Sequence, residues 1–298
     1  MGRLLYNVNF WLEYLTKSFD RSMPTNRQAG ETAEDVNYYC KINEPFILEG
    51  GSTLNELNLF KNSGYSYDLY RILYPFKNNL KFRHIFGDVT KVPRSPTFVK
   101  SRPICKDNQN AVLLPLDSNR HYKFVEDKKS FLSKKNKIVW RGAAYQKHRL
   151  EFLESCSRLP FLDAGNTSNS KEQKPKYVKK KMSIKEQLDS KFVISLEGND
   201  VATSLKWIMS SNSVCIMPKP KFETWFMEGI LQPNIHYVQI KDDYSNLEEQ
   251  FLKYLNAPDE CLKIISNANI HADKYRSKHT RLMLARMVCS KLFNLTDV

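Results

Sequence analysis

The chain has 298 residues, of which 41% are hydrophobic and 12% aromatic, and this is enough for two α/β lobes with their own cores. No stretch of about 18 uncharged apolar residues occurs, so the sequence predicts no transmembrane helix. The formal net charge of +14 indicates anionic partners, such as nucleic acid, a membrane surface, nucleotide-sugar phosphates or acidic glycolipid, and says nothing about the fold.

The first residues predict an amphipathic helix over 4–19, with Leu4, Val8, Trp11, Leu15 and Phe19 at helical spacing. Packing against the core is the simpler interpretation of this helix, and contact with a membrane is the alternative. The segment does not resemble a signal peptide, because polar residues interrupt its apolar run and no small-residue cleavage site follows. We therefore expect an intracellular protein.

Cysteine and histidine spacing gives no sign of a metal site. The six cysteines are scattered without a CxxC pair, so we expect reduced thiols that lie mostly in the core. The six histidines include no HExxH motif, and a structural or catalytic zinc ion is therefore not expected.

The first half of the chain has a less regular pattern than the second. Residues 20–40 are polar and irregular. Around 68–86 we expect a helix or loop and then a strand that ends at Phe86-Gly87-Asp88, and further strands are expected at 97–104 and 111–116. These elements could form an α/β lobe of their own.

From residue 136 onward, predicted strands alternate with predicted helices, which is typical of a parallel sheet with crossover helices. Strands are expected at 136–144, 160–165, 191–198, 213–219 and 235–240. Helices are expected at 146–159, 183–190, 200–211, 245–256, 259–270 and 272–294. The helix at 183 opens with a capping box of Ser183 and Glu186. The predicted fold class is α/β, with a Rossmann-like lobe in the second half.

Ligands of open parallel sheets bind beyond the carboxyl ends of the strands, and three predicted loops lie there. They begin at Arg141-Gly142, at Asp163 and at Glu197. Arg141 could offer a planar guanidinium to a phosphate, Gly142 could let the backbone approach a ligand, and Glu197 could accept hydrogen bonds from ribose hydroxyls. Each loop could equally be an ordinary turn. The motifs GxGxxG and GxxxxGK[ST] are absent, which disfavours a dinucleotide or P-loop enzyme.

The helix expected near Val201 could present free N–H groups to a ligand. Asp200 is the expected N-cap of this helix, accepting a hydrogen bond from the N–H of Thr203. A carboxylate at that position would repel a phosphate. If a diphosphate binds nearby, the positive charges of Arg141 and of a lysine such as Lys206 would have to outweigh this repulsion.

In the first half, Asp88 follows a glycine at a strand end. A turn residue is the simple interpretation, and a general base is the functional one. The nearby basic residues Lys100, Arg102, Arg120 and His121 are candidate contacts for an acceptor or a phosphate, or ordinary surface charge.

The landmarks KIVWRGAA (137–144), FLDAG (161–165), KFVISLEGNDVATSLKWIMSSNSVCIMPK (191–219) and HYVQIKDDYSNLEE (236–249) occur in a fixed order. Over about residues 80–275 the chain resembles glycosyltransferase family 90, the capsule-associated and lipopolysaccharide-A type, which includes the Rumi-like protein O-glucosyltransferases. FGDVTKVP (86–93), FVKSRPI (98–104) and LDSNRHYKF (116–124) extend the resemblance and point to its bacterial lipopolysaccharide core branch.

The resemblance implies a GT-B-like fold, with two Rossmann-like lobes and a nucleotide-sugar in the cleft between them. It places the acceptor-side lobe at 1–128 and the nucleotide-sugar-binding lobe at 129–274, with a last helix of about 275–298 that could pack back on the first lobe. It also implies inversion at the anomeric carbon without a metal ion or other cofactor.

Residue by residue, Asp88 matches the family's catalytic aspartate and Arg141 the arginine that contacts the nucleotide diphosphate. The donor-binding loop matches residues 199–204, so that donor contacts are expected from Gly142, Glu197, Asn199, Asp200, Thr203, Ser204 and Lys206. Ser204 departs from the arginine of eukaryotic members, so a different cation could hold the diphosphate.

Together these patterns predict a hexosyltransferase that moves glucose or galactose from a UDP-sugar to a lipopolysaccharide, lipooligosaccharide or related surface glycan. We expect it in the cytoplasm, with peripheral contact at the anionic inner face of the cytoplasmic membrane and no nucleic-acid partner. A noncatalytic polyanion- or nucleic-acid-binding protein is the alternative suggested by the charge, although no helix-turn-helix, zinc-finger or RNA-recognition motif is visible. A transferase fold that has lost catalysis is a third possibility, suggested by Ser204.

Overall fold

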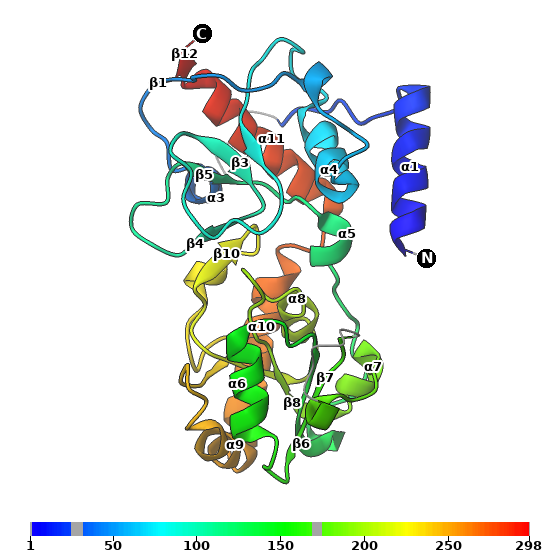
Figure 1. Cartoon of the computed structure of the whole chain (residues 1–298), viewed down its shortest axis with the longest axis vertical. Helices are drawn as coiled ribbons and strands as arrows, with labels where there is room; N and C mark the ends of the chain where they lie inside the picture. Colours follow the sequence, from blue (N-terminus) through cyan, green and yellow to red (C-terminus); the bar gives the residue numbers. More distant parts are fainter. Residues whose placement is uncertain (1, 25–31, 169–174, 298) are drawn as a thin grey trace. The chain divides into compact units, whose positions relative to one another are not determined.

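The computed structural model describes residues 2–24, 32–168 and 175–297 of the chain (Figure 1). It is a mixed α/β protein with parallel sheets, as the alternation of strands and helices predicts. The chain falls into two compact units. Unit 1 comprises Met1–Tyr122, Lys221–Gly229 and Ser277–Val298, and unit 2 comprises Lys123–Pro220 and Ile230–Arg276.

Unit 2 contains a five-stranded parallel sheet in the order β11-β9-β8-β6-β7. Its strands are β6 (Lys135–Gly142), β7 (Leu162–Asn166), β8 (Ser190–Ile194), β9 (Val214–Met217) and β11 (Val238–Gln239). The buried apolar residues of β6, β8 and β9, among them Ile138, Phe192 and Ile216, explain why these segments read as continuous hydrophobic runs. Every predicted strand of the second half is present.

The helices of unit 2 are α6 (Lys147–Cys156), α7 (Ile184–Gln187), α8 (Leu205–Met209), α9 (Leu247–Leu255) and α10 (Pro258–Asp273), with 3₁₀ turns at Phe131–Ser133 and Pro175–Tyr177. The capping box of Ser183 and Glu186 is present at the start of α7, as predicted. Phe152 of α6, Phe251 of α9 and Ile264 of α10 join the apolar core of the sheet.

Unit 1 contains a three-stranded parallel sheet in the order β2-β3-β5, formed by β2 (His84–Ile85), β3 (Thr97–Val99) and β5 (Ala111–Leu113). Two further pairs are β1 (Phe46–Ile47) with β12 (Thr296–Asp297), and β4 (Ser101–Pro103) antiparallel to β10 (Phe222–Thr224). The helical elements are α1 (Gly2–Thr16), α3 (Ala33–Tyr39), α4 (Ser63–Leu73), α5 (Ser118–His121) and α11 (Lys278–Asn294), with 3₁₀ turns at Leu54–Glu56 and, reaching into unit 2, Glu228–Ile230.

The N-terminal helix is present, but its predicted core face is only partly correct. Trp11 is half-buried and Phe19, just beyond the end of the helix, is buried, as predicted. Leu4, Val8 and Leu15 are exposed, and the helix packs instead through Tyr6, Phe10 and Glu13. The ring of Phe10 stacks on Tyr67 of α4 with 3.7 Å between centroids. Directional contacts of aromatic and polar side chains, which hydrophobic spacing does not reveal, decide which face of this helix is buried.

Two other helix boundaries differ from the predictions, and one helix was not predicted. The segment 272–294 is not one helix, because α10 ends at Asp273 and Ser277 caps the separate helix α11 by accepting a hydrogen bond from the N–H of Thr280. The helix expected from Val201 begins only at Leu205. Part of the region expected to be irregular, residues 33–39, forms α3.

The cysteines agree with the expectation of reduced core thiols. All six are free, and all except the exposed Cys105 are buried. Among the described residues, no helix combines the length and apolar character needed to cross a membrane.

A buried ion pair attaches β10 to the rest of unit 1. The Nε of Arg102 in β4 lies 2.7 Å from Oε1 of Glu223 in β10, and both side chains are buried. The guanidinium also donates to the carbonyls of Tyr38, Tyr39 and Ala111, and the Tyr38 hydroxyl donates to Glu223. Removal of one partner would leave a buried charge without compensation.

We predict that Glu223→Gln lowers the stability of the protein by about 3–5 kcal/mol, because Arg102 would remain buried without an anion. The thermal midpoint of the full chain measures this loss. Replacement of both residues by methionine should restore part of it, since no uncompensated charge then remains. Glu151→Gln, at the exposed pair with Lys147, is the matched control and should change stability by less than about 0.5 kcal/mol. Equal midpoints for Glu223→Gln and the control would contradict the prediction.

Candidate active site

In unit 1, Asp88 lies at the carboxyl end of β2, as the sequence predicts for the residue after Gly87. Gly87 has a φ of +100°, a backbone conformation that residues other than glycine rarely adopt. The Asp88 carboxylate is 28% exposed, and its Oδ1 lies 2.7 Å from Nζ of Lys100. Lys100 is buried between β3 and β4, so the ammonium group is held in place beneath the carboxylate.

Arg120 also lies beside Asp88, and His121 contacts Arg120 in turn. Arg120 of α5 places Nη2 at 3.8 Å from Oδ1 of Asp88, and its Nε binds Asp117 at 3.1 Å. His121 is buried, and its Nε2 lies 3.2 Å from Nη2 of Arg120. Burial raises the pKa of Asp117, and the charge of Arg120 opposes this effect. Unit 1 therefore assembles one partly exposed carboxylate with cations from two other segments.

Arg102 has a different role from the one expected. Its side chain is buried, and its guanidinium binds Glu223 and the carbonyls of Tyr38, Tyr39 and Ala111. The expectation of an acceptor or phosphate contact is corrected here, because the guanidinium connects β4 to β10 and to the end of α3 and has no surface to offer a ligand. Its position next to the strand motif that includes Lys100 gave no indication of this burial.

In unit 2, Arg141 lies at the carboxyl end of β6 and binds the neighbouring strand. Its Nη2 contacts both carboxylate oxygens of Asp163 in β7, at 2.8 and 2.9 Å, and its Nη1 donates to the Asp163 carbonyl. Lys179 binds the same carboxylate at 2.8 Å. The planar fork predicted for a phosphate therefore holds a carboxylate in this structure.

Gly142 is required by close packing. A Cβ atom at this position would lie 2.7 Å from Cζ2 of Trp140, whose indole is in the core. Gly142 ends β6 in register with Asn166 at the end of β7, and the Asn166 side chain accepts from the N–H of Ala144. The loop after β6 is thereby connected to the loop after β7.

The loop after β8 contains Glu197, Gly198, Asn199 and Asp200, and Arg149 of α6 holds it. The guanidinium donates from Nε to the Glu197 carbonyl at 2.7 Å, from Nη2 to the Leu196 carbonyl at 2.8 Å and from Nη1 to the Ala143 carbonyl at 2.9 Å. Arg149 therefore joins the loops after β6 and β8. Burial lowers the pKa of its guanidinium.

Neighbours of Arg149 strengthen the same connection. Nε2 of His148 lies 2.9 Å from the Glu197 carbonyl, and the Gln146 amide donates to Oδ1 of Asn199 at 3.2 Å. Gln146, His148 and Arg149 are not among the site residues predicted from the sequence. Their place at the start of the helix that follows Arg141-Gly142 could have indicated them, but only the fold shows that they reach the loop after β8.

Asp200 is not the N-cap of α8. The N-cap position is Ser204, whose side chain makes no capping hydrogen bond, and Asp200 is buried four residues before it. The carbonyl of Asp200 accepts from the N–H of Gly198 in a tight turn, which delays the start of the helix. Thr203 and Ser204 are half-buried in the segment before α8, and Lys206 is buried in its first turn.

Each unit therefore gathers part of the predicted site. In unit 1 these are Asp88, Lys100, Arg120 and His121, and in unit 2 they are the strand-end loops with Arg141, Gly142, Glu197 and Asn199. In the described part of the chain, no group of three or more His, Cys, Asp or Glu side chains is placed to hold a metal ion.

Residues 118–281 match glycosyl transferase family 90, which is more than half of the chain. The chain is also 45% identical to the O-glucosyltransferase LpsA of Dichelobacter nodosus over 280 residues, which covers 94% of this chain and 87% of that protein. The chain belongs to glycosyl transferase family 90 and is a glycosyltransferase. The resemblance found in the sequence is confirmed for the family, and the alternative of a noncatalytic polyanion-binding protein is set aside.

We predict that Arg149→Ala loosens the two loops that its guanidinium joins, because three carbonyl groups lose their donor. Hydrogen–deuterium exchange should show faster exchange of the backbone amides at 143–146 and 196–200. Arg158→Ala, at an exposed arginine just beyond the end of the same helix, is the control and should leave these amides unchanged. Unchanged protection in Arg149→Ala would exclude the connecting role.

We predict that Asp163 makes a pH-dependent contribution to the stability of the fold. Burial opposes ionisation of this carboxyl, but hydrogen bonds from Lys179 and Arg141 outweigh it and lower the pKa of Asp163. The resulting stabilisation is therefore present above the unfolded-state pKa of about 4 and is lost as the pH falls through the folded-state value. Thermal midpoints between neutral and acidic pH should fall more steeply for the wild type than for Asp163→Asn. Parallel curves would show that the pair contributes nothing.

Proposed function

We propose that this glycosyltransferase moves a hexose from a UDP-sugar to a lipopolysaccharide or lipooligosaccharide core, or to a related surface glycan. The observation that carries this proposal is the 45% identity, over 94% of the chain, to a protein named an O-glucosyltransferase. That name favours glucose over galactose as the transferred sugar. The reaction would take place in the cytoplasm, and its acceptor would bring the protein to the anionic inner face of the cytoplasmic membrane.

The donor would bind unit 2, and the two units would correspond to the lobes of a GT-B fold. The parallel sheet supports this assignment, because ligands of such sheets bind at the carboxyl ends of the strands. The loops after β6 and β8 lie at that edge and are held together by Arg149. Glu197, Asn199 and Thr203 would contact ribose or sugar hydroxyls from this edge.

Arg141 can serve the donor diphosphate only if it shares or releases Asp163. Both carboxylate oxygens of Asp163 accept from its Nη2. Lys179 would keep the carboxylate paired during such an exchange, since it already binds Oδ1. We therefore assign Asp163 the role of holding the Arg141 guanidinium in orientation until a diphosphate competes for it.

Asp88 would act as the general base of an inverting transfer. Its carboxylate would take the proton of the acceptor hydroxyl while that oxygen attacks the anomeric carbon and the bond from this carbon to the UDP oxygen breaks. The 28% exposure of Asp88 leaves it accessible, and the buried Lys100 fixes its position. Arg120 borders the carboxylate and would contact the acceptor, while the buried His121 would support the Arg120 guanidinium from behind. Without a metal ion, cations of the protein would have to stabilise the departing diphosphate.

We predict that Asp88→Asn lowers kcat by at least about 100-fold, because the amide cannot accept the proton. Binding of UDP should remain within about twofold, since the change removes no group of unit 2. Transfer from UDP-glucose to a deacylated lipooligosaccharide measures the first effect, and calorimetry with UDP measures the second. Asp243→Asn, at an exposed turn, is the control for an aspartate elsewhere on the surface. Unchanged turnover in Asp88→Asn would remove Asp88 from the mechanism.

The identity of the donor can be tested with the same preparation. A thermal-shift comparison of UDP, GDP, CMP and their sugars should show selective stabilisation by UDP and UDP-glucose, because a ligand that binds only the folded state raises its stability by mass action. Equal responses to all nucleotides would contradict the UDP assignment.

A further inference from the structure

A stripe of exposed aliphatic side chains runs along α1. Leu4, Leu5, Val8, Leu12 and Leu15 are between 47% and 74% exposed. At 3.6 residues per turn they fall within an arc of about 100°, which is the width of an apolar face that normally packs on a core. Large apolar side chains rarely gather on a free surface without a partner.

The opposite face already holds α1 in unit 1. The Tyr6 hydroxyl donates to Oδ1 of Asp68 at 2.7 Å, and Phe10 stacks on Tyr67. Glu13, the one acidic residue of α1, binds Nε of Arg71 at 2.7 Å. The aliphatic stripe is therefore not the face through which the helix binds its own unit, and it carries no carboxylate.

Aromatic side chains border the stripe, and a cation lies beyond each of its ends. Arg3 is exposed in the first turn, on the side of the helix away from the stripe where its charge acts on Asp117, and Lys17 follows directly after Thr16. Phe60, which is 86% exposed, stacks on Trp11 with 5.2 Å between ring centroids, and the exposed Lys61 follows it in the chain. Aromatic and cationic side chains next to aliphatic ones are typical of surfaces that lie in the headgroup region of a bilayer.

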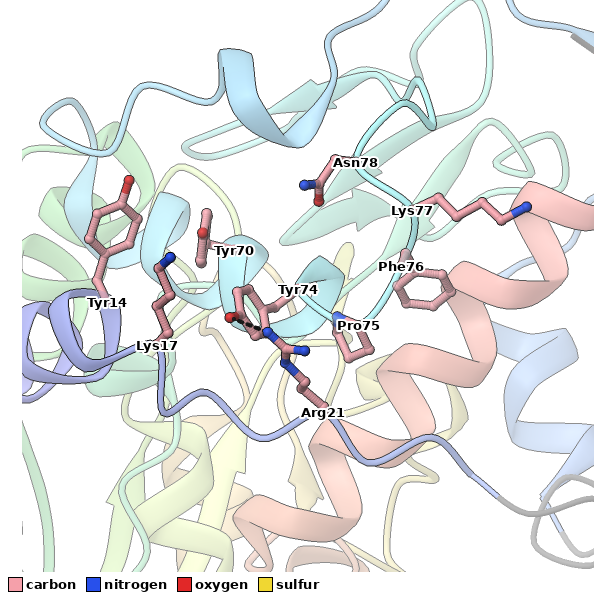
Figure 2. A pocket seen from close by; sticks show the side chains of 9 residues that line it. All are labelled: Tyr14, Lys17, Arg21, Tyr70, Tyr74, Pro75, Phe76, Lys77 and Asn78. Carbon is pink, nitrogen blue, oxygen red and sulfur yellow. Dashed lines mark hydrogen bonds between the residues drawn. The ribbon is translucent and has the colours of Figure 1, made fainter.

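A pocket at the C-terminal end of α1 is lined by further cationic side chains (Figure 2). It has a volume of about 590 Å³ and is lined by Tyr14, Lys17, Arg21, Tyr70, Tyr74, Pro75, Phe76, Lys77 and Asn78. Nη2 of Arg21 donates to the Tyr74 hydroxyl at 3.0 Å, and its guanidinium lies over the same ring. Three cations and three phenols, without a carboxylate among the lining residues, suit a phosphate group.

We propose that α1 docks unit 1 on the surface of an anionic phospholipid bilayer. The helix lies in the plane of the interface, with its aliphatic stripe at the boundary of the acyl chains and the pocket of Figure 2 on a lipid phosphate. This deepens the proposed function, because a glycolipid acceptor would be met on that surface. A second copy of the chain fits less well, since two stripes face to face would cover the aliphatic side chains but would leave the cationic pocket without an anion.

Sedimentation of the full chain with vesicles tests the proposal, in the absence of nucleotide-sugar. Binding should be strong to vesicles of phosphatidylethanolamine with phosphatidylglycerol, weak to phosphatidylcholine alone, and reduced by salt. The variant Leu4→Ser/Leu12→Ser/Leu15→Ser should lower the partition coefficient at least about tenfold, because it removes apolar surface and no charge. Lys17→Ala/Arg21→Ala/Lys77→Ala should remove the preference for the anionic vesicles.

Leu132→Ser/Ile270→Ser is the matched control, because both residues are exposed and lie in unit 2. It should bind vesicles like the wild type, and unchanged thermal midpoints would show that each variant is folded. Wild-type protein that ignores anionic vesicles, or a stripe variant that binds them equally well, would overturn the proposal. So would a stripe variant that turns a dimer into a monomer while vesicle binding stays absent. Stabilisation by UDP is measured separately, so failure here leaves the proposed transfer reaction standing.

Discussion

The three hydrogen bonds of the Arg149 guanidinium hold together the loops that follow β6 and β8. Its acceptors are the carbonyls of Ala143, Leu196 and Glu197, from the ends of two adjacent parallel strands. Buried carbonyls at strand ends need donors, and irregular loops supply few of their own. One planar side chain with several donors satisfies this need and sets the distance between the loops at the same time. Arg149 of α6 therefore joins these loops, whereas Arg141, at the end of β6, binds Asp163.

Charged residues of the two units divide by burial into those that build the structure and those that can meet a ligand. Arg102 and Glu223 are buried and bind β10, from the distant segment Lys221–Gly229, to β4. Lys100 is equally buried, but its partner Asp88 is partly exposed, so the pair offers one accessible carboxylate with a fixed orientation. Arg141 stands between these cases, since its side chain is mostly covered while the carboxylate that it binds is accessible. This gradation supports a base at Asp88 and an exchangeable guanidinium at Arg141.

Much of the fold follows from patterns that are local in the sequence. Buried parallel strands read as apolar runs, and each predicted strand of unit 2 is present because its side chains are covered on both faces. The capping box at Ser183 was predicted because it depends on adjacent residues only. The family was predicted from the order of landmarks along the chain and is confirmed. The start of α8 was predicted too early, because the residues around the tight turn between Gly198 and Asp200 have a helical sequence pattern but are not helical.

The sequence by itself determined the α/β class, the strands that end at the candidate loops, and the family of the enzyme. Only the tertiary structure decided which partner each charged side chain takes: Asp163 for Arg141, three carbonyls for Arg149, and Glu223 for Arg102. It also decided that the aliphatic stripe of α1 faces outward, because Tyr6, Phe10 and Glu13 find partners on α4. The physical reason is the same in each case. Secondary structure depends on residues a few positions apart, whereas the partner of a polar or aromatic side chain depends on which distant segments the fold brings within a few ångströms of it.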